Sequence, residues 1–333
     1  MIIGEEPAVE EALPITAADV AAAAARGRGV IVHTPLLRLQ GPGLPAGAEI
    51  WLKPENLQLT GSFKLRGAYN KLAALSAADR ARGVIAYSSG NHAQGVACAA
   101  HLLGIQATIV MPTDAPPVKL AATQGWGATV VPCAPGSEAR RLLAEALQRE
   151  HGYVLVPPYD DPLIMAGQGT AMLEILADLP DPDLLLFPVG GGGLLSGNAT
   201  ALKGRRPQAR IIGVEPALAA DATASFRAGH IVQWSAAQTG STVADGVRTQ
   251  ALGAQPWTVI QRMVDDMATV EEAAILDAVR YLARHARLVV EPTGALPLAA
   301  VLSGAVNVTN QRVVLFISGG NVEPTALAAI LAA

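Results

Sequence analysis

The 333-residue sequence predicts an α/β protein whose two halves each contain a parallel sheet covered by helices. Its length is sufficient for two hydrophobic cores, because domains usually span roughly 100–200 residues. Short apolar runs alternate with helical stretches in both halves, and this alternation is typical of parallel sheets. No low-complexity tract or long linker separates the halves. They should therefore pack closely, with a ligand cleft between them.

In the first half, a helix is expected over Ala17–Arg26, where Thr16 and Asp19 resemble a capping box. A strand over Ile50–Leu52 and a helix over Ala68–Leu75 follow. Regular alternation then begins, with a strand over Val84–Tyr87, a helix over 91–104, a strand over 105–111, a Pro-bounded helix and a strand over 128–133.

The second half repeats this pattern. An apolar run over 153–158 and a helix near Asp161–Ala177 precede a strand over Leu184–Val189 and a helix after Gly193. A strand over 209–216 follows, and the chain closes with a strand over Val313–Ile317 and a terminal helix. The second half is therefore predicted to be α/β as well.

Composition narrows the possible partners. The formal net charge is -4 with only 16% charged residues, and no run of Lys and Arg offers a surface for nucleic acid or an anionic membrane. The N-terminus is acidic and lacks a long apolar region, so we expect a soluble cytoplasmic protein that binds small molecules. Cys98 and Cys133 are far apart in apolar surroundings and are interpreted as core thiols.

Lys64 lies in the segment Thr60–Gly67, between a strand and a helix. An isolated lysine at such a place is ordinarily a solvated surface residue. In an apolar cleft near a helix N-terminus, however, its pKa would fall, and the free amine could form a Schiff base with an aldehyde cofactor.

Two turns after strands carry small polar side chains. The segment Ser88–Gln94 places hydroxyls, an amide and free backbone N–H groups between a strand and a helix, which suits a carboxylate. Ser89 or Asn91 could instead be a helix cap, and His92 a packed neutral histidine. Ser318 ends the last strand, where ligands of open α/β folds bind, although a lone Ser-Gly-Gly is also a common turn.

Four consecutive glycines, Gly190–Gly193, follow an apolar strand and precede a helix. Their amides suit a phosphate, whereas a simple turn needs fewer glycines. With Ser196, and with Glu215 after the next strand, the loop also forms an imperfect dinucleotide fingerprint. A nicotinamide-dependent oxidoreductase is therefore kept as an alternative.

In this order, these elements resemble the threonine dehydratase and serine racemase branch of the type II pyridoxal-phosphate enzymes. The resemblance spans nearly the whole chain. Its further matches are Glu55-Asn56, Ala166–Thr170, Ala244–Val247 and Glu291–Gly294. It implies the tryptophan synthase β-like fold, with two open twisted parallel-sheet domains and the cofactor in the cleft. It further implies a large cofactor-binding domain of residues 1–84 and 162–333, a small mobile domain of residues 85–161, and a homodimer.

The resemblance implies a role for each matching residue. Lys64 would carry the cofactor, Phe63 would pack on its ring, and Asn91 would bond its phenolic oxygen. Ser318 would meet the pyridine nitrogen. The phosphate would be held by the amides of Gly190, Gly191, Gly192, Gly193 and Leu194, and the remaining cofactor contacts would be Gly246, Glu291 and Gly319. The substrate carboxylate would be surrounded by Ser88, Ser89, Asn91 and His92.

A divalent-metal site is also implied by the resemblance to the serine racemase group. Its ligands would be the carboxylates of Glu215 and Asp221 and the carbonyl of Ala219. Oxygen ligands of this kind suit Mg²⁺, Mn²⁺ or Ca²⁺. An arbitrary acidic pair would instead be solvated at the surface.

The expected activity is dehydration of L-threonine or L-serine to 2-oxobutanoate or pyruvate and ammonia, with Lys64 as the base. Ser89 stands where serine racemases keep a second acid/base, so racemisation is an alternative. The resemblance also places Arg140 and Tyr159 at the substrate: Arg140 matches a basic position of the serine racemase group, and Tyr159 stands where threonine dehydratases usually have a Phe. Either could admit a more polar substrate such as 3-hydroxyaspartate. A non-catalytic amino-acid sensor is disfavoured by the intact Lys64, Asn91 and Ser318.

Overall fold

The structure of the protein, a computed structural model, describes residues 12–333. Residues 1–11, which carry most of the acidic N-terminal segment on which the expected cytoplasmic location rests, lie outside the described residues. Within the described range, no helix is both long and apolar enough to cross a membrane.

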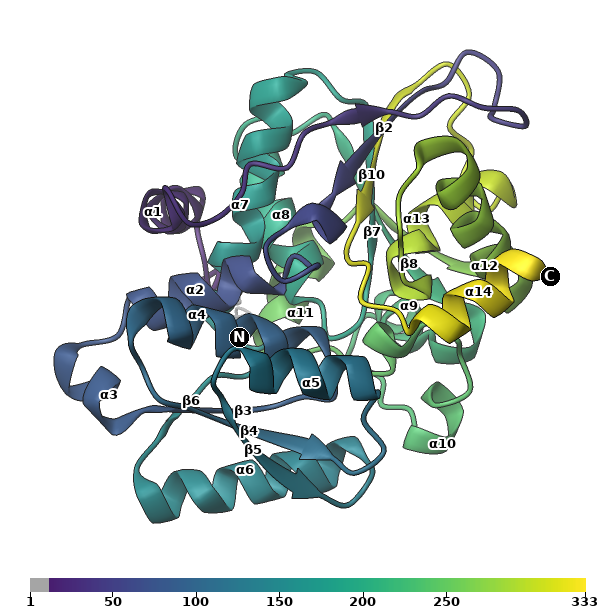
Figure 1. Cartoon of the computed structure of the whole chain (residues 1–333). Coiled ribbons are helices and arrows are strands. Elements are labelled where there is room, and N and C mark those ends of the chain that lie inside the picture. Colours follow the sequence, from purple (N-terminus) through teal and green to yellow (C-terminus); the bar gives the residue numbers. More distant parts are fainter. Residues whose placement is uncertain (1–11) are drawn as a thin grey trace, which may run out of the picture.

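The larger of two sheets has six strands in the order β1-β2-β10-β7-β8-β9 (Figure 1). Every neighbouring pair is parallel except β1 and β2, so the predicted parallel sheet carries one short antiparallel edge strand. The strands are β1 (Leu37–Arg38), β2 (Glu49–Pro54), β7 (Leu184–Pro188), β8 (Arg210–Pro216), β9 (Asp266–Val270) and β10 (Arg312–Ile317).

Apolar side chains alternate between the two faces of this sheet, as a pleated strand requires. Leu185 and Phe187 of β7 belong to the core formed with α1, α7, α8 and α11, whereas Leu184 and Leu186 belong to the core formed with α12 and α13. The bounds of these helices are α1 (Ala17–Gly27), α7 (Pro162–Asp178), α8 (Gly193–Lys203), α11 (Ala254–Met263), α12 (Glu272–Tyr281) and α13 (Pro292–Leu302). The predicted capping box of α1 is present.

The smaller sheet is parallel throughout, with strand order β5-β4-β3-β6. Its strands are β3 (Val84–Tyr87), β4 (Ala107–Pro112), β5 (Thr129–Cys133) and β6 (Val154–Leu155). Figure 1 shows α6 (Ser137–His151) on one face, with α4 (Asn91–Leu103) and α5 (Pro117–Gly125) on the other. Cys98 is buried in this core as expected, but Cys133 is only half-buried.

The helix α2 (Lys64–Ala73) begins four residues earlier than predicted, at Lys64 itself. It packs against α4 on one side and α7 on the other, so it lies where the two halves meet. Division of the chain into residues 1–84 with 162–333, and 85–161, remains our proposal, with α2 at the junction. The remaining helical segments are η1 (Glu55–Leu57), α3 (Ala77–Arg82), η2 (Ala217–Ala219), α9 (Asp221–Ala228), α10 (Ala236–Thr239), η3 (Asp245–Val247), η4 (Leu282–Ala286) and α14 (Pro324–Ala332).

Candidate active site

A cavity of about 790 Å³ opens where strands β3, β7 and β10 end. Its position at the carboxyl ends of parallel strands is the usual ligand site of such folds. The predicted residues that line it are Phe63, Lys64, Ser88, Ser89, Asn91, His92, Arg140, Tyr159, Gly190, Gly191, Gly192, Gly193, Leu194, Gly246, Glu291 and Ser318. Folding therefore gathers segments that are far apart in the chain around one space.

Lys64 is the first residue of α2, and its Nζ donates a hydrogen bond of 2.8 Å to the Pro158 carbonyl. Burial of the ammonium group lowers the pKa of Lys64 to about 8. A large fraction of the molecules therefore carries a neutral, nucleophilic amine at this position near pH 8.

Three other lysines are buried, and each is bound to a carboxylate. These ion pairs are Lys53–Glu174, Lys71–Asp161 and Lys119–Asp245. Of the three lysines, only Lys119 lines the cavity. Burial disfavours its charge, but Glu291 and Asp245 outweigh this effect and raise the pKa of Lys119 above its ordinary value. Lys64 is thus the lysine best suited to react with an aldehyde.

The turn after β3 presents the residues predicted to bind a carboxylate. Ser88 and Ser89 are half-buried at the cavity, and the Ser88 hydroxyl accepts a hydrogen bond from the Gly90 amide. The first amides of α4 follow, and such amides have no partner within their own helix.

The surroundings of His92 match the alternative of a packed, neutral histidine. Its Nε2 must donate to the Val156 carbonyl at 2.9 Å, since a carbonyl only accepts. Burial lowers the pKa of His92 to about 3, so the ring is neutral and its buried Nδ1 offers only a lone pair. The His92 ring cannot donate to a substrate carboxylate in this state. Its backbone amide could.

Asn91, Glu291 and Ser318 lie together at the base of the cavity. Asn91 Nδ2 donates to Glu291 Oε1 at 2.6 Å, and its Oδ1 accepts from Asn321 at 2.8 Å. Burial raises the pKa of Glu291 to about 7. Ser318 Oγ and Glu291 Oε2 are buried without a hydrogen-bond partner in the described part of the chain. Gly319 packs beside Glu291 and does not itself line the cavity.

The glycine loop is closely covered by Tyr159. A Cβ added at Gly191 would lie 2.3 Å from the Tyr159 ring, and Gly192 has a φ of +89°. The loop leads directly into α8, so its backbone amides form the positive N-terminal end of this helix. This geometry suits a phosphate group.

Arg140, on α6, reaches the cavity from the small sheet. Its Nε is buried without a hydrogen-bond partner, and among residues 12–333 no carboxylate forms an ion pair with its guanidinium. Burial lowers the pKa of Arg140, and the charge of Asp114, which also lines the cavity, offsets this effect only in part. Neighbouring Arg141, in contrast, is paired with Glu145 at 2.6 Å.

The predicted metal ligands lie outside the cavity lining. Glu215, at the end of β8, and Asp221, at the start of α9, are fully buried, as is Ala219 between them. Glu215 accepts hydrogen bonds from Ala222 and Thr223, but both Asp221 oxygens lack a partner among the described residues. A solvated acidic pair is therefore excluded.

The position of Glu215 argues against the dinucleotide-binding alternative. Glu215 points to the amides of α9 and does not line the cavity beside the glycine loop. It therefore does not occupy the place where a ribose-binding acid would be needed.

Several cavity residues were not predicted as site residues, and three of them are polar residues with a clear place in the geometry: Thr249, Lys119 and Asp245. Thr249 Oγ1 is buried without a partner in the described range and faces Gly190, which suits a phosphate contact. Lys119 and Asp245 form an ion pair of 2.6 Å across the two halves. Asp245 belongs to a motif noted in the sequence, whereas nothing in the local pattern at Thr249 or Lys119 indicates their positions.

Comparison with known proteins agrees with this geometry. Residues 28–319 match the family model described as pyridoxal-phosphate dependent enzyme. The chain is 44% identical to an L-threo-3-hydroxyaspartate ammonia-lyase from Pseudomonas sp., covering 94% of this chain and 97% of that one. It is 41% identical to a serine racemase from Schizosaccharomyces pombe, covering 92% and 94%.

A solved structure, the T.th. threonine deaminase, superimposes with a TM-score of 0.87 at 46% identity, covering 93% of this chain and 99% of that one. The predicted fold with two parallel-sheet domains, and the resemblance to this branch of enzymes, are confirmed.

Proposed function

Because the chain belongs to the family of pyridoxal-phosphate dependent enzymes, we propose that it is an ammonia-lyase that removes water and ammonia from a β-hydroxy amino acid. We further propose L-threo-3-hydroxyaspartate as the preferred substrate. The observation that carries the reaction type is Lys64, whose amine has a pKa lowered to about 8 beside a glycine loop and a serine that suit the cofactor.

The cavity residues fit pyridoxal phosphate. Two buried hydroxyl groups of the cavity, Ser318 Oγ and Thr249 Oγ1, lack a hydrogen-bond partner within residues 12–333, and such atoms are costly unless a ligand or water satisfies them. We propose that the amides of 190–194 hold the phosphate and that Phe63 packs on the ring. When bound, the cofactor supplies an aldehyde that joins the substrate amine and a ring that accepts electrons from Cα.

The chain's own residues then perform the proton transfers. The neutral Lys64 amine removes the α-proton of the substrate. If the cofactor is bound as proposed, Ser318 would offer a neutral hydroxyl to its ring nitrogen, so that this nitrogen would not need to be protonated. Ser88, Ser89 and the first amides of α4 hold the α-carboxylate.

Arg140 supports an acidic substrate. Its guanidinium lines the cavity without a carboxylate partner in the described chain, whereas the cavity cation Lys119 is already paired with Asp245. A partly buried cation is stabilised by an anionic ligand, and arginine binds carboxylates through two parallel hydrogen bonds. The side-chain carboxylate of 3-hydroxyaspartate provides such a partner, and threonine or serine does not.

The test is an assay of ammonia and oxo-acid formation from L-threo-3-hydroxyaspartate, L-serine and L-threonine. We expect Arg140→Gln to lower kcat/KM for hydroxyaspartate by about tenfold to a hundredfold, the loss of one charge-assisted contact, with little change for serine. Arg141→Gln, whose arginine is already paired, is the matched control.

If the wild type prefers threonine or serine, the substrate proposal is wrong and the sequence-based expectation of those substrates holds. If it forms no oxo acid from any of the three, the ammonia-lyase proposal is wrong.

Racemisation is the second candidate, since Ser89 lines the cavity and a relative is a serine racemase. Chiral chromatography of the same L-serine reactions detects it. Ser89→Ala should abolish any D-serine formation while most L-substrate dehydration persists, because Lys64 alone serves elimination.

We also propose a divalent cation, Mg²⁺, Mn²⁺ or Ca²⁺, at Glu215, Asp221 and the Ala219 carbonyl. The fully buried Asp221 carboxyl group supports it: neither of its oxygens has a partner among the described residues, and burial raises the pKa of Asp221 to about 7, an effect that a bound cation would reverse. Among residues 12–333 no group of three or more His, Cys, Asp or Glu side chains could hold a metal, so backbone oxygen or water would complete the coordination.

A further inference from the structure

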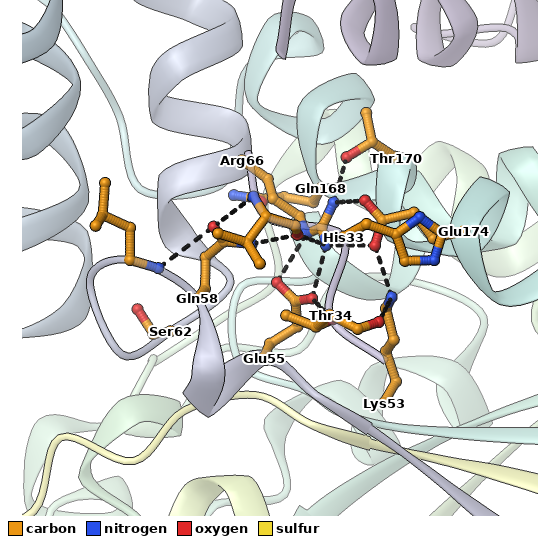
Figure 2. A network of polar contacts seen from close by, with 12 residues as sticks. His33, Thr34, Lys53, Glu55, Gln58, Ser62, Arg66, Gln168, Thr170 and Glu174 are labelled. Atoms are coloured by element: carbon orange, nitrogen blue, oxygen red, sulfur yellow. Dashed lines mark hydrogen bonds and ion pairs between the residues drawn. The ribbon is translucent and has the colours of Figure 1, made fainter. Parts of the chain in front are cut away.

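The first turn of α2 contributes Arg66 to a network of four charged side chains that takes no part in the proposed reaction. It consists of Lys53, Glu55, Arg66 and Glu174, two cations and two carboxylates (Figure 2). Lys53, Glu55 and Arg66 are at most 1% exposed. We call these four residues the α2 charge network.

Arg66 is the centre of this network. Its Nε and Nη2 bond both oxygens of Glu55 at 2.7 Å, and its Nη1 and Nη2 bond both oxygens of Glu174 at 2.7 and 2.8 Å. Thr170 Oγ1 and the Val32 carbonyl accept further bonds. Figure 2 shows the guanidinium of Arg66 between the two carboxylates. The planar fork of arginine makes this double bridge possible, which a lysine could not.

Stability alone does not account for such a network. Removing charges from water costs several kcal/mol per ion, and well-packed apolar residues in their place are often equally or more stable, by ~1–4 kcal/mol. What the network provides is a directional connection between three elements. Arg66 belongs to α2, Glu55 to η1 after β2, and Glu174 to α7.

No side-chain hydrogen bond caps the first turn of α2, so the contacts of side chains within this turn, including those of Arg66, hold it in place. The residue before the helix is Phe63, which makes no side-chain capping bond. The backbone amide of Phe63 donates to the Ser318 carbonyl at 3.1 Å, so this residue is tied to the segment that follows β10. Lys64 and Arg66 lie in this same turn. Arg66 ties the turn to Glu55 and Glu174, while Lys64 lines the cavity.

Packing around this turn leaves little freedom. A Cβ added at Gly95 would lie 3.0 Å from the backbone of Lys64, and one added at Gly167 would lie 2.6 Å from Gly67. Any shift of α2 relative to α7 is therefore transmitted to Lys64 and to α4.

We propose that Arg66 is a positioning residue that, through Glu55 and Glu174, fixes the Lys64 amine relative to the cofactor. The inference rests on the proposed role of Lys64 as the cofactor-bearing residue. A misplacement of about 1 Å far from the chemistry can lower a rate a hundredfold, so loss of the double bridge should affect turnover and cofactor geometry.

The test compares Arg66→Lys with Lys203→Met. Arg66→Lys keeps the charge but removes the fork, whereas Lys203→Met breaks the Lys203–Asp265 ion pair, which includes no residue of the α2 charge network. We expect Arg66→Lys to lower kcat by about tenfold to a hundredfold, as supporting contacts of a site commonly do. We expect Lys203→Met to leave kcat per folded molecule within about twofold of the wild type, with at most a small change in melting temperature.

Two readouts are independent of activity. In Arg66→Lys, we expect a higher dissociation constant for the complex of the apoenzyme with pyridoxal phosphate. We also expect the absorbance of the Lys64-bound cofactor to change with pH over a different range than in the wild type. Should Arg66→Lys fail to fold, Glu174→Gln, at a carboxylate whose side chain is 17% exposed, removes the charge of one bridge more mildly.

A folded variant with wild-type kcat, cofactor affinity and spectrum would overturn the positioning role. Failure of the proposed function is distinguished by Lys64→Ala: if that variant keeps the cofactor absorbance, Lys64 does not carry the cofactor and both proposals fall.

Discussion

At the scale of single residues, the surroundings of an amine decide its chemistry. Lys64 forms no ion pair with a carboxylate of residues 12–333, and burial lowers its pKa to about 8. Lys119 keeps its charge because Asp245 and Glu291 flank it. Because only the neutral amine attacks an aldehyde, the apoenzyme should capture pyridoxal phosphate faster as pH rises through about 8, with a plateau above it.

Stopped-flow absorbance across roughly pH 6 to 10.5 measures this capture, and Lys64→Ala, which should show no band, is the blank. A rate that still rises toward pH 10.5, the ordinary pKa of lysine, would mean that burial does not activate Lys64.

At the scale of elements, the glycine loop between β7 and α8 offers backbone amides to a ligand and is packed tightly against Tyr159. A Cβ at Gly191 would meet the Tyr159 ring at 2.3 Å, too close for any real contact. Gly191→Ala should therefore displace the loop or the ring, at a cost of about 1–3 kcal/mol. We expect cofactor affinity to fall roughly tenfold or more.

Titration of the apoenzyme with pyridoxal phosphate measures the effect. Gly125→Ala is the matched control, since a Cβ there meets nothing within 4 Å. Equal affinities in the two variants would show that the phosphate does not depend on this loop.

At the scale of the whole molecule, a cation at Asp221 would link the large sheet to α9 and stabilise the fold. A ligand that binds only the folded state stabilises it by about 2.7 kcal/mol at 100 times its dissociation constant. Chelation should therefore lower the melting temperature, and Asp221→Asn or Glu215→Gln should remove that response. Asp221→Asn is the cleaner variant, since its carboxylate bonds no described residue.

Scanning calorimetry with EDTA, and again after adding Mg²⁺ or Ca²⁺, measures the response. A melting temperature that chelator leaves unchanged would count against the metal site. The homodimer and the cytoplasmic location remain predictions at this scale.

The sequence was sufficient to predict the α/β class with two parallel-sheet domains and to name many of the residues that line the cavity. Local periodicity located the strands that end at Tyr87, Pro188 and Ile317 to within about one residue, and short motifs directly after them supplied Ser88–His92, Gly190–Gly193 and Ser318. Such signals are local, because consecutive residues are enough to identify an apolar strand followed by a glycine or serine turn.

The partners of side chains from distant segments, in contrast, could not be predicted and became known from the fold. The lone pair of His92, the guanidinium of Arg140 without a carboxylate and the paired ammonium of Lys119 depend on neighbours from distant segments of the described chain. The same holds for Arg66, which the sequence presents as part of a motif and the fold joins to Glu174, 108 residues away. Charge and protonation follow burial and partners, and neither can be read from a residue's own position in the chain.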